Sequence, residues 1–281
     1  MSYVPEFVAL YEIFPYIEYL PLNNESIRVA VKDYLEGGEK KDVIIKKYGK
    51  IEDWNTSEVT DMNNLFYFAK NFNEDISKWN TSNVTAMYSM FQFATRFNQP
   101  IGLWDTSSVT DMHCMFSCSE FNQPIGGWNV SNVTDMCEMF RACINFNQPI
   151  GIWDVSKVTD MNGMFRCTKS FNQDISDWDT STVTNMDCMF SGAESFNQPI
   201  GEWDTSHVTD MEYMFREAFD FNQPIGEWNT SKVVYMEFMF CEAVSFNQDI
   251  SDWDTSSVID MRGMFNSAKS FNLENAPWYH E

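Results

Sequence analysis

A tryptophan recurs through most of the chain at a fixed interval. Successive tryptophans lie 25 residues apart, except for a step of 24 residues between Trp104 and Trp128. A fixed period in the twenties is typical of repeat proteins, in which a short unit buries its apolar side only by stacking against copies of itself. The sequence therefore predicts one elongated array. The repeats begin at Trp54, Trp79, Trp104, Trp128, Trp153, Trp178, Trp203, Trp228 and Trp253, and Trp278 begins a partial tenth copy.

The repeats share the phrase W-[DN]-[TV]-S-x-V-T-D-M-x-x-M-F-x-x-A-x-x-F-N-Q-[PD]-I-[GS]-x, so each position forms a column of equivalent residues. The Trp, Val, Met, Phe and Ile columns predict a continuous core in which like side chains stack on like. The β-branched segment Ser-x-Val-Thr-Asp-Met predicts a short parallel strand. The apolar spacing of three in x-x-Met-Phe-x-x-Ala predicts one or two helical turns. The predicted fold class is thus an α/β repeat solenoid with one short strand and one short helical segment per coil.

The first 50 residues do not repeat, and they predict a helical N-terminal cap on a solenoid that occupies residues 51–281. Two helices are expected in the cap, over Glu25–Glu36 and Glu39–Tyr48, with Val43 and Ile44 of the second pointing inward. Such a cap would cover a cross-section of core that the stack otherwise exposes. A separate docking module is the alternative.

An asparagine follows the second Phe of every repeat. Because its amide both donates and accepts hydrogen bonds, we expect it to satisfy backbone groups in turns that have no regular ladder. The turn that follows contains Pro-Ile-Gly or Asp-Ile-Ser, so its Gly position requires a small residue rather than a positive φ. The asparagine ladder consists of Asn73, Asn98, Asn122, Asn147, Asn172, Asn197, Asn222, Asn247 and Asn272.

The net charge of −23 argues against nucleic acid and anionic membrane surfaces as partners, because both require clusters of Lys and Arg. No segment approaches the ~18 uninterrupted apolar residues of a membrane helix. Residues Met1–Leu20 lack the basic start and cleavage site of a signal peptide. Seven cysteines form no regular pairs, which favours free thiols and an intracellular, cytoplasmic location. The extracellular surface is the alternative.

The residues of catalysis and metal binding do not recur together. The three histidines, His113, His207 and His280, have no partner at catalytic or ligand spacing, so we expect no enzyme, no cofactor and no metal site. Aspartate exchanges with asparagine after the tryptophan, which is typical of an Asx turn. Stacked carboxylates bridged by calcium are the alternative.

Aromatic residues interrupt the polar variable columns in two places, one early and one late in the array. Aromatic side chains beyond those that the core needs are candidate contact anchors for a protein partner. Packing against the cap or the last coil is the alternative, and a second copy of the chain is an alternative partner. The candidate interface residues are Tyr67, Phe68, Tyr88 and Phe93, and then Tyr213, Phe219, Tyr235 and Phe238.

Over about residues 51–271, the phrase W-D-T-S-x-V-T-D-M-x-x-M-F-x-x-A-x-x-F-N-Q-P-I resembles the BspA-like leucine-rich-repeat family of bacterial surface proteins, protists and large DNA viruses. The resemblance implies a leucine-rich-repeat-like solenoid with a role in protein–protein or host interaction. We therefore expect a non-enzymatic interaction scaffold. The alternatives are a cell-surface adhesin or host-attachment protein, a calcium-stabilised binding module, and a hydrolase with its site in the groove.

Overall fold

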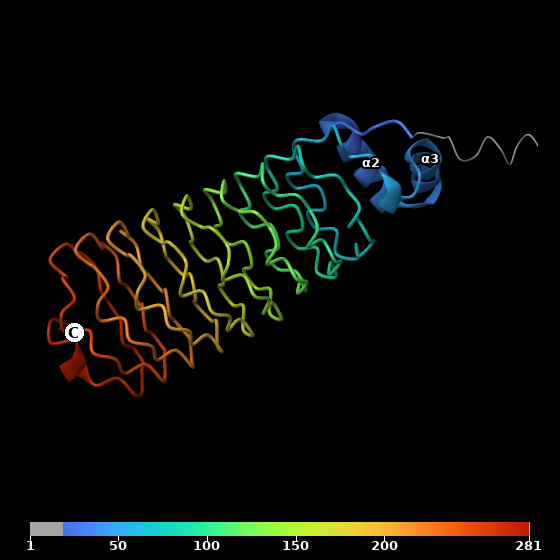
Figure 1. Ribbon diagram of the computed structural model, residues 1–281. Coiled ribbons are helices and arrows are strands. Elements are labelled where there is room, and N and C mark those ends of the chain that lie inside the picture. Colours follow the sequence, from blue (N-terminus) through green and yellow to red (C-terminus); the bar gives the residue numbers. More distant parts are fainter. Residues whose placement is uncertain (1–18, 281) are drawn as a thin grey trace, which may run out of the picture.

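The computed structural model describes residues 19–280, which form an elongated stack of coils with two helices at one end (Figure 1). Helices α2 (Asn24–Glu36) and α3 (Gly38–Tyr48) precede the stack, and the short 3-10 helix η2 (Ile51–Asp53) leads into it. A second 3-10 helix, η3 (Leu273–Asn275), lies at the other end. We number the coils by their tryptophans, from coil 1 at Trp54 to coil 9 at Trp253. Residues 1–18 of the predicted cap, with most of the segment tested for a signal peptide, lie outside the described residues.

The two helices predicted from the sequence are present, and their ends follow from local chemistry. The Asn23 side chain accepts hydrogen bonds from the N–H groups of Glu25 and Ser26, which begins α2. Helix α2 buries Ile27, Ala30, Val31 and Tyr34. In α3, Ile44 and Tyr48 are buried as predicted. The inward position predicted for Val43 is wrong, because 61% of this residue is exposed.

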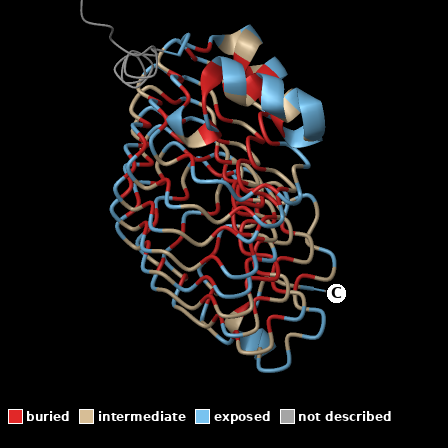
Figure 2. Ribbon diagram, turned by 90° about the vertical axis from the view of Figure 1, so that its right-hand side faces the viewer, coloured by how far each residue is buried: buried red, intermediate tan, exposed pale blue. Residues whose placement is uncertain are grey.

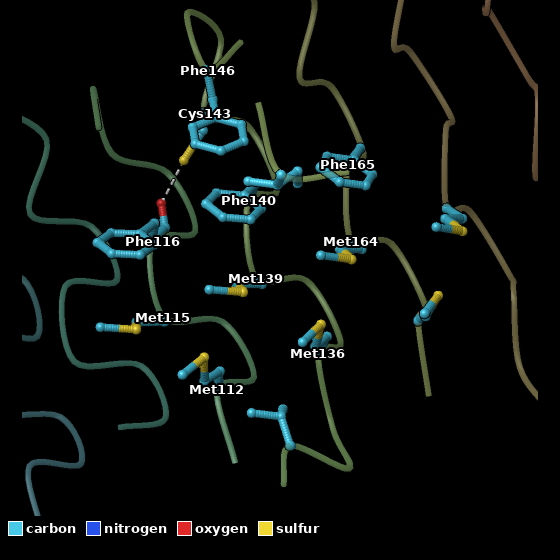
Figure 3. Close-up of a cluster of buried hydrophobic side chains, with 14 of the residues drawn as sticks. Met112, Met115, Phe116, Met136, Met139, Phe140, Cys143, Phe146, Met164 and Phe165 are labelled. Carbon is cyan, nitrogen blue, oxygen red and sulfur yellow. Dashed lines mark hydrogen bonds between the residues drawn. The ribbon is translucent and has the colours of Figure 1, made fainter. Parts of the chain in front are cut away.

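Buried residues run along the inside of the stack (Figure 2). Their side chains form ladders, in which like residues of successive coils lie over one another. The rings of Phe140 and Phe165, in adjacent coils, are stacked with centroids 5.9 Å apart. Methionines fill the space beside these rings (Figure 3). Trp79 and the later tryptophans also donate a hydrogen bond from the indole N–H to the carbonyl of the isoleucine just before the preceding tryptophan, as Trp153 does to Ile125 at 3.3 Å. Each coil therefore shares both its apolar surface and its polar groups with its neighbours.

The predicted fold class is wrong in its secondary structure. Residues 19–280 contain no β-strand, since each coil contributes one residue to isolated parallel bridges such as Asp135↔Asp160. The segment predicted as helical consists of consecutive turns in every coil, and α2 and α3 are the α-helices of the described residues. A solenoid with one strand and one helical segment per coil is therefore not what this sequence forms.

The hydrogen bonds of one coil explain why neither element forms. In coil 1, the N–H groups of Met62, Asn64, Phe66 and Phe68 bind carbonyls of coil 2. Between them, the N–H groups of Leu65 and Tyr67 bind the carbonyl three residues back, at 3.3 and 3.1 Å. The N–H of Asn63 binds Oδ1 of Asp61. In an α-helix the N–H groups bind carbonyls of the same segment, four residues back, and a strand requires an extended backbone. Alternate use of the N–H groups prevents both.

The glycine of the Pro-Ile-Gly turn is required for its size, as predicted. Gly102 and Gly126 do not have positive φ. A Cβ atom at Gly126 would lie 2.5 Å from the carbonyl oxygen of Pro149 in the next coil, and one at Gly102 would lie 2.2 Å from that of Pro124. The backbones of adjacent coils therefore approach each other too closely at this turn for a larger residue.

Candidate functional site

Four neighbouring columns on one side of the stack change their residue from coil to coil. They occupy the turns between the buried methionines and phenylalanines. Most of their side chains are exposed or half-buried, whereas Leu65 and Phe66, for example, are buried. We call this surface the variable face. In coil 1 its residues are Asn63, Asn64, Tyr67 and Phe68, and in coil 7 they are Glu212, Tyr213, Arg216 and Glu217.

Two columns of the variable face have left-handed backbone conformation in every coil. Phe68 and Phe93 have φ of 59° and 60°, and Tyr213 has φ of 53°. Residues other than glycine rarely adopt positive φ, because Cβ then crowds the backbone. The hydrogen bonds to the next coil hold this conformation in place. The non-glycine residues concerned are Asn64, Phe68, Ser89, Phe93, Cys114, Cys118, Glu138, Ala142, Cys167, Cys188, Tyr213, Glu217, Phe238, Glu242 and Ser267.

The aromatic residues predicted early in the array form one exposed cluster and one separate pair. Phe68 stacks on Phe93 with centroids 4.4 Å apart, and Tyr67 packs edge-on against Phe68 at 4.7 Å. Tyr67 and Phe68 are 46% and 49% exposed, although both lie beside the helical end of the stack. Tyr88 lies apart from them and stacks on the imidazole of His113 at 4.7 Å. We call Tyr67, Phe68 and Phe93 the first aromatic cluster.

The predicted late aromatic residues are less exposed. Tyr213 and Phe238 stack with centroids 5.2 Å apart, and the guanidinium of Arg216 lies over the Tyr213 ring. Both rings and that of Phe219 are half-buried, whereas Tyr235 is 40% exposed and occupies the bridge column. The predicted residues of coils 7 and 8 therefore do not form one continuous exposed patch.

Carboxylates surround the late aromatic pair. Burial raises the pKa of Asp210 and of Glu212, and nearby carboxylates, Asp187 and Glu237 among them, raise both pKa values further. The Oδ1 atom of Asp187 is buried and has no hydrogen-bond partner among the described residues. Arg262 forms ion pairs with Glu237 and Asp260 at the edge of this region. Arg216 forms an ion pair with Glu217 inside the region, so carboxylates outnumber basic residues on this part of the variable face.

Three side chains of types that bind metals lie close together in coils 3 and 4, and the sequence analysis did not predict this cluster. Asp111 and Asp135 occupy the bridge column of adjacent coils, and His113 lies two residues after Asp111. The Nδ1 atom of His113 lies 2.8 Å from Oδ1 of Asp111, and one ligand atom from each of the three residues lies within 4.8 Å of the others. Alignment of the repeats already places both aspartates in one column. The position of His113 beside that column was therefore the sequence signal that could have predicted the cluster.

The asparagine ladder lies along one edge of the stack. Oδ1 of Asn147 accepts hydrogen bonds from the backbone N–H of Asn172, at 3.0 Å, and from the amide of Gln173, at 2.9 Å. The same bond to the following asparagine N–H recurs along the stack. These asparagines are half-buried or exposed, so they connect the coils from outside the core.

The aspartates after the tryptophans hold turns. Oδ1 of Asp105 accepts hydrogen bonds from the hydroxyl and the N–H of Ser107, at 2.6 and 3.0 Å, which lowers the pKa of Asp105. Asn129 makes the same two bonds to Ser131. Aspartate and asparagine are therefore equivalent here as turn-forming acceptors.

The repeats match a known family. A family profile described as "Mycoplasma protein of unknown function, DUF285" matches the chain over residues 40–142, 117–218 and 198–281, so that it covers the array from coil 1 to coil 9. The chain belongs to this family. No curated protein and no solved structure matches it. Membership in DUF285 identifies a repeat protein, and its description leaves the function open.

The cysteines of this DUF285 chain gather on or beside the variable face, and all seven are free thiols. Burial, together with the adjacent Glu138 carboxylate, raises the pKa of Cys114 to about 12. Cys137 and Cys143 also have pKa values of about 12, mainly through burial. Since the thiolate is the nucleophilic form, these three thiols are poor nucleophiles at neutral pH.

Two short helices account for the α-helical structure of residues 19–280, and neither has the length or the apolar surface that a membrane span requires.

Proposed function

We propose that this protein is a non-enzymatic scaffold that binds a protein partner through its variable face. The observation that carries the proposal is the contrast between columns. The core and turn columns mostly keep their residues, while the four columns of the variable face hold many different residues along the array on a backbone that stays the same. A constant frame that displays changing side chains suits recognition of an extended partner surface.

The first aromatic cluster is the proposed anchor. Exposed aromatic side chains contribute strongly to protein interfaces, because they bury large areas with little loss of side-chain entropy. The carboxylates around Glu212 and Glu237 suit a partner with basic residues, because opposite charges steer association. The resemblance to BspA-like arrays supports the same class of role.

Photo-crosslinking tests the anchor. A photoreactive amino acid at Tyr67 should crosslink to a protein partner in cells of the native host. Leu103 is the matched control, because it is 93% exposed but lies in the turn before Trp104, outside the variable face. Purified partner should then bind the double variant Tyr67→Ser/Phe68→Ser at least about tenfold more weakly, as expected for loss of an aromatic hot spot. Equal crosslinking at both positions, or unchanged affinity, would contradict the proposal.

A second copy of the chain is the other partner to test. Light scattering should give the mass of a monomer for the wild-type chain and for Tyr213→Ser/Phe238→Ser. A dimer that this double variant dissociates would instead assign the late aromatic pair to self-association.

The proposed location is intracellular, and the surface adhesin is its alternative. Seven free thiols suit a reducing compartment, because exposed thiols oxidise outside the cell. Cells should be lysed directly into denaturant that contains an alkylating agent, so that free thiols are trapped at once. Mass spectrometry should then find all seven cysteines reduced. Oxidised cysteines or attached sugar would favour the adhesin.

A further inference from the structure

We propose that coils 3 and 4 bind a divalent transition-metal ion, with His113, Asp111 and Asp135 as its protein ligands. A binding scaffold does not need such a site, so the proposal goes beyond the proposed function.

Geometry is the first argument. One ligand atom from each residue lies within 4.8 Å of the others, and all three residues are half-buried. The bridge Asp111↔Asp135 and the hydrogen bond from the N–H of Met112 to the carbonyl of Asp135, at 3.1 Å, fix the register of the two coils. Small side-chain movements would therefore bring the three atoms to ligand distances of about 2.0–2.2 Å from one ion.

The imidazole is already held in place. It lies parallel to the Tyr88 ring, with centroids 4.7 Å apart and planes 4° from parallel. Its Nδ1 atom lies 2.8 Å from Asp111 Oδ1, so a carboxylate faces one ring nitrogen. The stacking limits rotation of the imidazole before an ion binds, which reduces the side-chain entropy that ligation would otherwise remove.

Uncompensated charge is the second argument. The bridge column carries carboxylates in three consecutive coils, at Asp111, Asp135 and Asp160. At the ends of the stack the same column is neutralised by arginine, with Arg28 on Asp61 and Arg262 on Asp260, both at 2.9 Å. In residues 19–280, Asp135 and Asp160 have no ion pair with a lysine or arginine.

The half-buried Asp135 carboxylate lies between Asp111 and Asp160 in the bridge column, where like charges in adjacent coils repel each other. A bound divalent cation would remove this repulsion, because it is the largest local charge in such a site.

The donor atoms indicate the class of metal. Imidazole nitrogen with two carboxylates suits Zn²⁺ and its neighbours in the first transition row, whereas calcium and magnesium sites use oxygen ligands. Elsewhere the bridge column has no histidine beside it, and coil 7 has Asp210 followed by Glu212. The cluster supplies three protein ligand atoms, so water is the expected fourth ligand.

Isothermal titration of the full chain with Zn²⁺ tests the site, and the visible absorption of bound Co²⁺ reports its ligands. Wild-type protein should bind one equivalent. His113→Gln and Asp135→Asn should each weaken binding by at least about tenfold. Asp210→Asn is the matched control, since it removes a carboxylate from the same column without a histidine beside it, and it should keep the wild-type affinity. Circular dichroism and thermal melts should show that every variant folds.

Four outcomes would overturn the proposal. The first is that folded wild-type protein shows no saturable binding of Zn²⁺ or Co²⁺. The second is unchanged affinity in folded His113→Gln and Asp135→Asn, and the third is equal weakening by Asp210→Asn. The fourth is loss of binding in Cys114→Ser/Cys137→Ser but not in His113→Gln. The last result would assign the metal to the thiols.

Discussion

Coils 1 and 9 share most core columns of the repeat, including its Trp, Val, first Met and two Phe residues, but their outer sides are covered differently. In coil 1 the two helices stand in for a preceding coil. Tyr34 and Tyr48 pack edge-on against Trp54 at 5.8 and 6.4 Å, and Oδ1 of Asn24 accepts from the N–H of Thr60 at 2.8 Å. Thr85 occupies the same column in coil 2, and its N–H binds the carbonyl of Thr60 in coil 1. The Asn24 side chain thus replaces a carbonyl that a preceding coil would supply.

Coil 9 has no comparable cover. η3 and residues Trp278 and Tyr279 pack on it, and Val258, Met261, Phe265 and Phe271 remain only partly buried. The same columns are 0% exposed in coils 3 to 7. A repeat of this phrase therefore does not bury its own core residues, because its burial comes from the coil on each side.

The largest test of this contrast compares two phenylalanines in one column. Phe165→Ala in coil 5 removes a ring that is fully buried, and it should lower the free energy of unfolding by roughly 3–5 kcal/mol. Phe265→Ala in coil 9 removes a partly buried ring, and we expect about 1–2 kcal/mol. Urea unfolding followed by tryptophan fluorescence measures both. Equal losses would show that the terminal coil is packed as firmly as the interior.

A second test measures how closely the interior coils approach each other, and two adjacent glycines provide it. Gly126→Ala places a methyl group 2.5 Å from the Pro149 carbonyl oxygen, so the two coils must move apart. We expect a loss of roughly 1–3 kcal/mol. Gly127→Ala meets no atom within 4 Å and has ordinary φ, so it should leave stability unchanged or raise it by about 0.4–1 kcal/mol. Similar melting temperatures for the two variants would contradict the close approach.

The N-terminal end can be tested through a single amide. Asn24→Ala removes the acceptor shared by the N–H groups of Thr60 and Asp61, and also the bond from its Nδ2 to the Thr60 hydroxyl at 2.9 Å. We expect a loss of about 1–2 kcal/mol in thermal or urea unfolding. Asn71→Ala is the control, because this exposed asparagine makes no side-chain hydrogen bond within the described residues. Unchanged stability of Asn24→Ala would show that the helices do not replace the missing coil.

The smallest effect concerns thiol labelling, which reports opening of the stack without a mutation. Cys143 lies in coil 4, is fully buried, and donates to the Phe116 carbonyl at 2.8 Å (Figure 3). At pH 8 it should react with a maleimide after exposed Cys167 and after Cys241, which lies in coil 8 near the less covered end.

Burial raises the pKa of Cys143 to about 12 in the closed stack, so the thiol is a poor nucleophile at pH 8 until its coil opens. Its labelling rate should therefore rise with pH through the ordinary thiol pKa of about 8.5, because the opened thiol is exposed to water. Peptide mass spectrometry at several times gives the order of labelling. Early reaction of Cys143 would show that the interior coils open as readily as the terminal ones.

Much of the arrangement could be predicted from the repeats themselves. The tryptophan period establishes the array, and residues that do not change between coils, such as Phe140 and Met139, are those that the core buries. Helix α2 was predictable because its cap, apolar stripe and terminating glycine are local signals. Of the predicted aromatic residues, Tyr67 and Phe68 lie together in the open, whereas Tyr88 pairs with a histidine that no local pattern linked to it.

By itself, the sequence determined the period, the inward columns and the side of each coil that varies, because all three depend on which residues recur. Only the tertiary structure decided the backbone within a coil and the meeting of His113, Asp111 and Asp135. The physical reason is the same for both. Half of the N–H groups in each turn find their acceptor in the next coil, about 25 residues away, so local propensity for strand or helix cannot act alone. Contacts of that range also place side chains from adjacent coils within reach of one another.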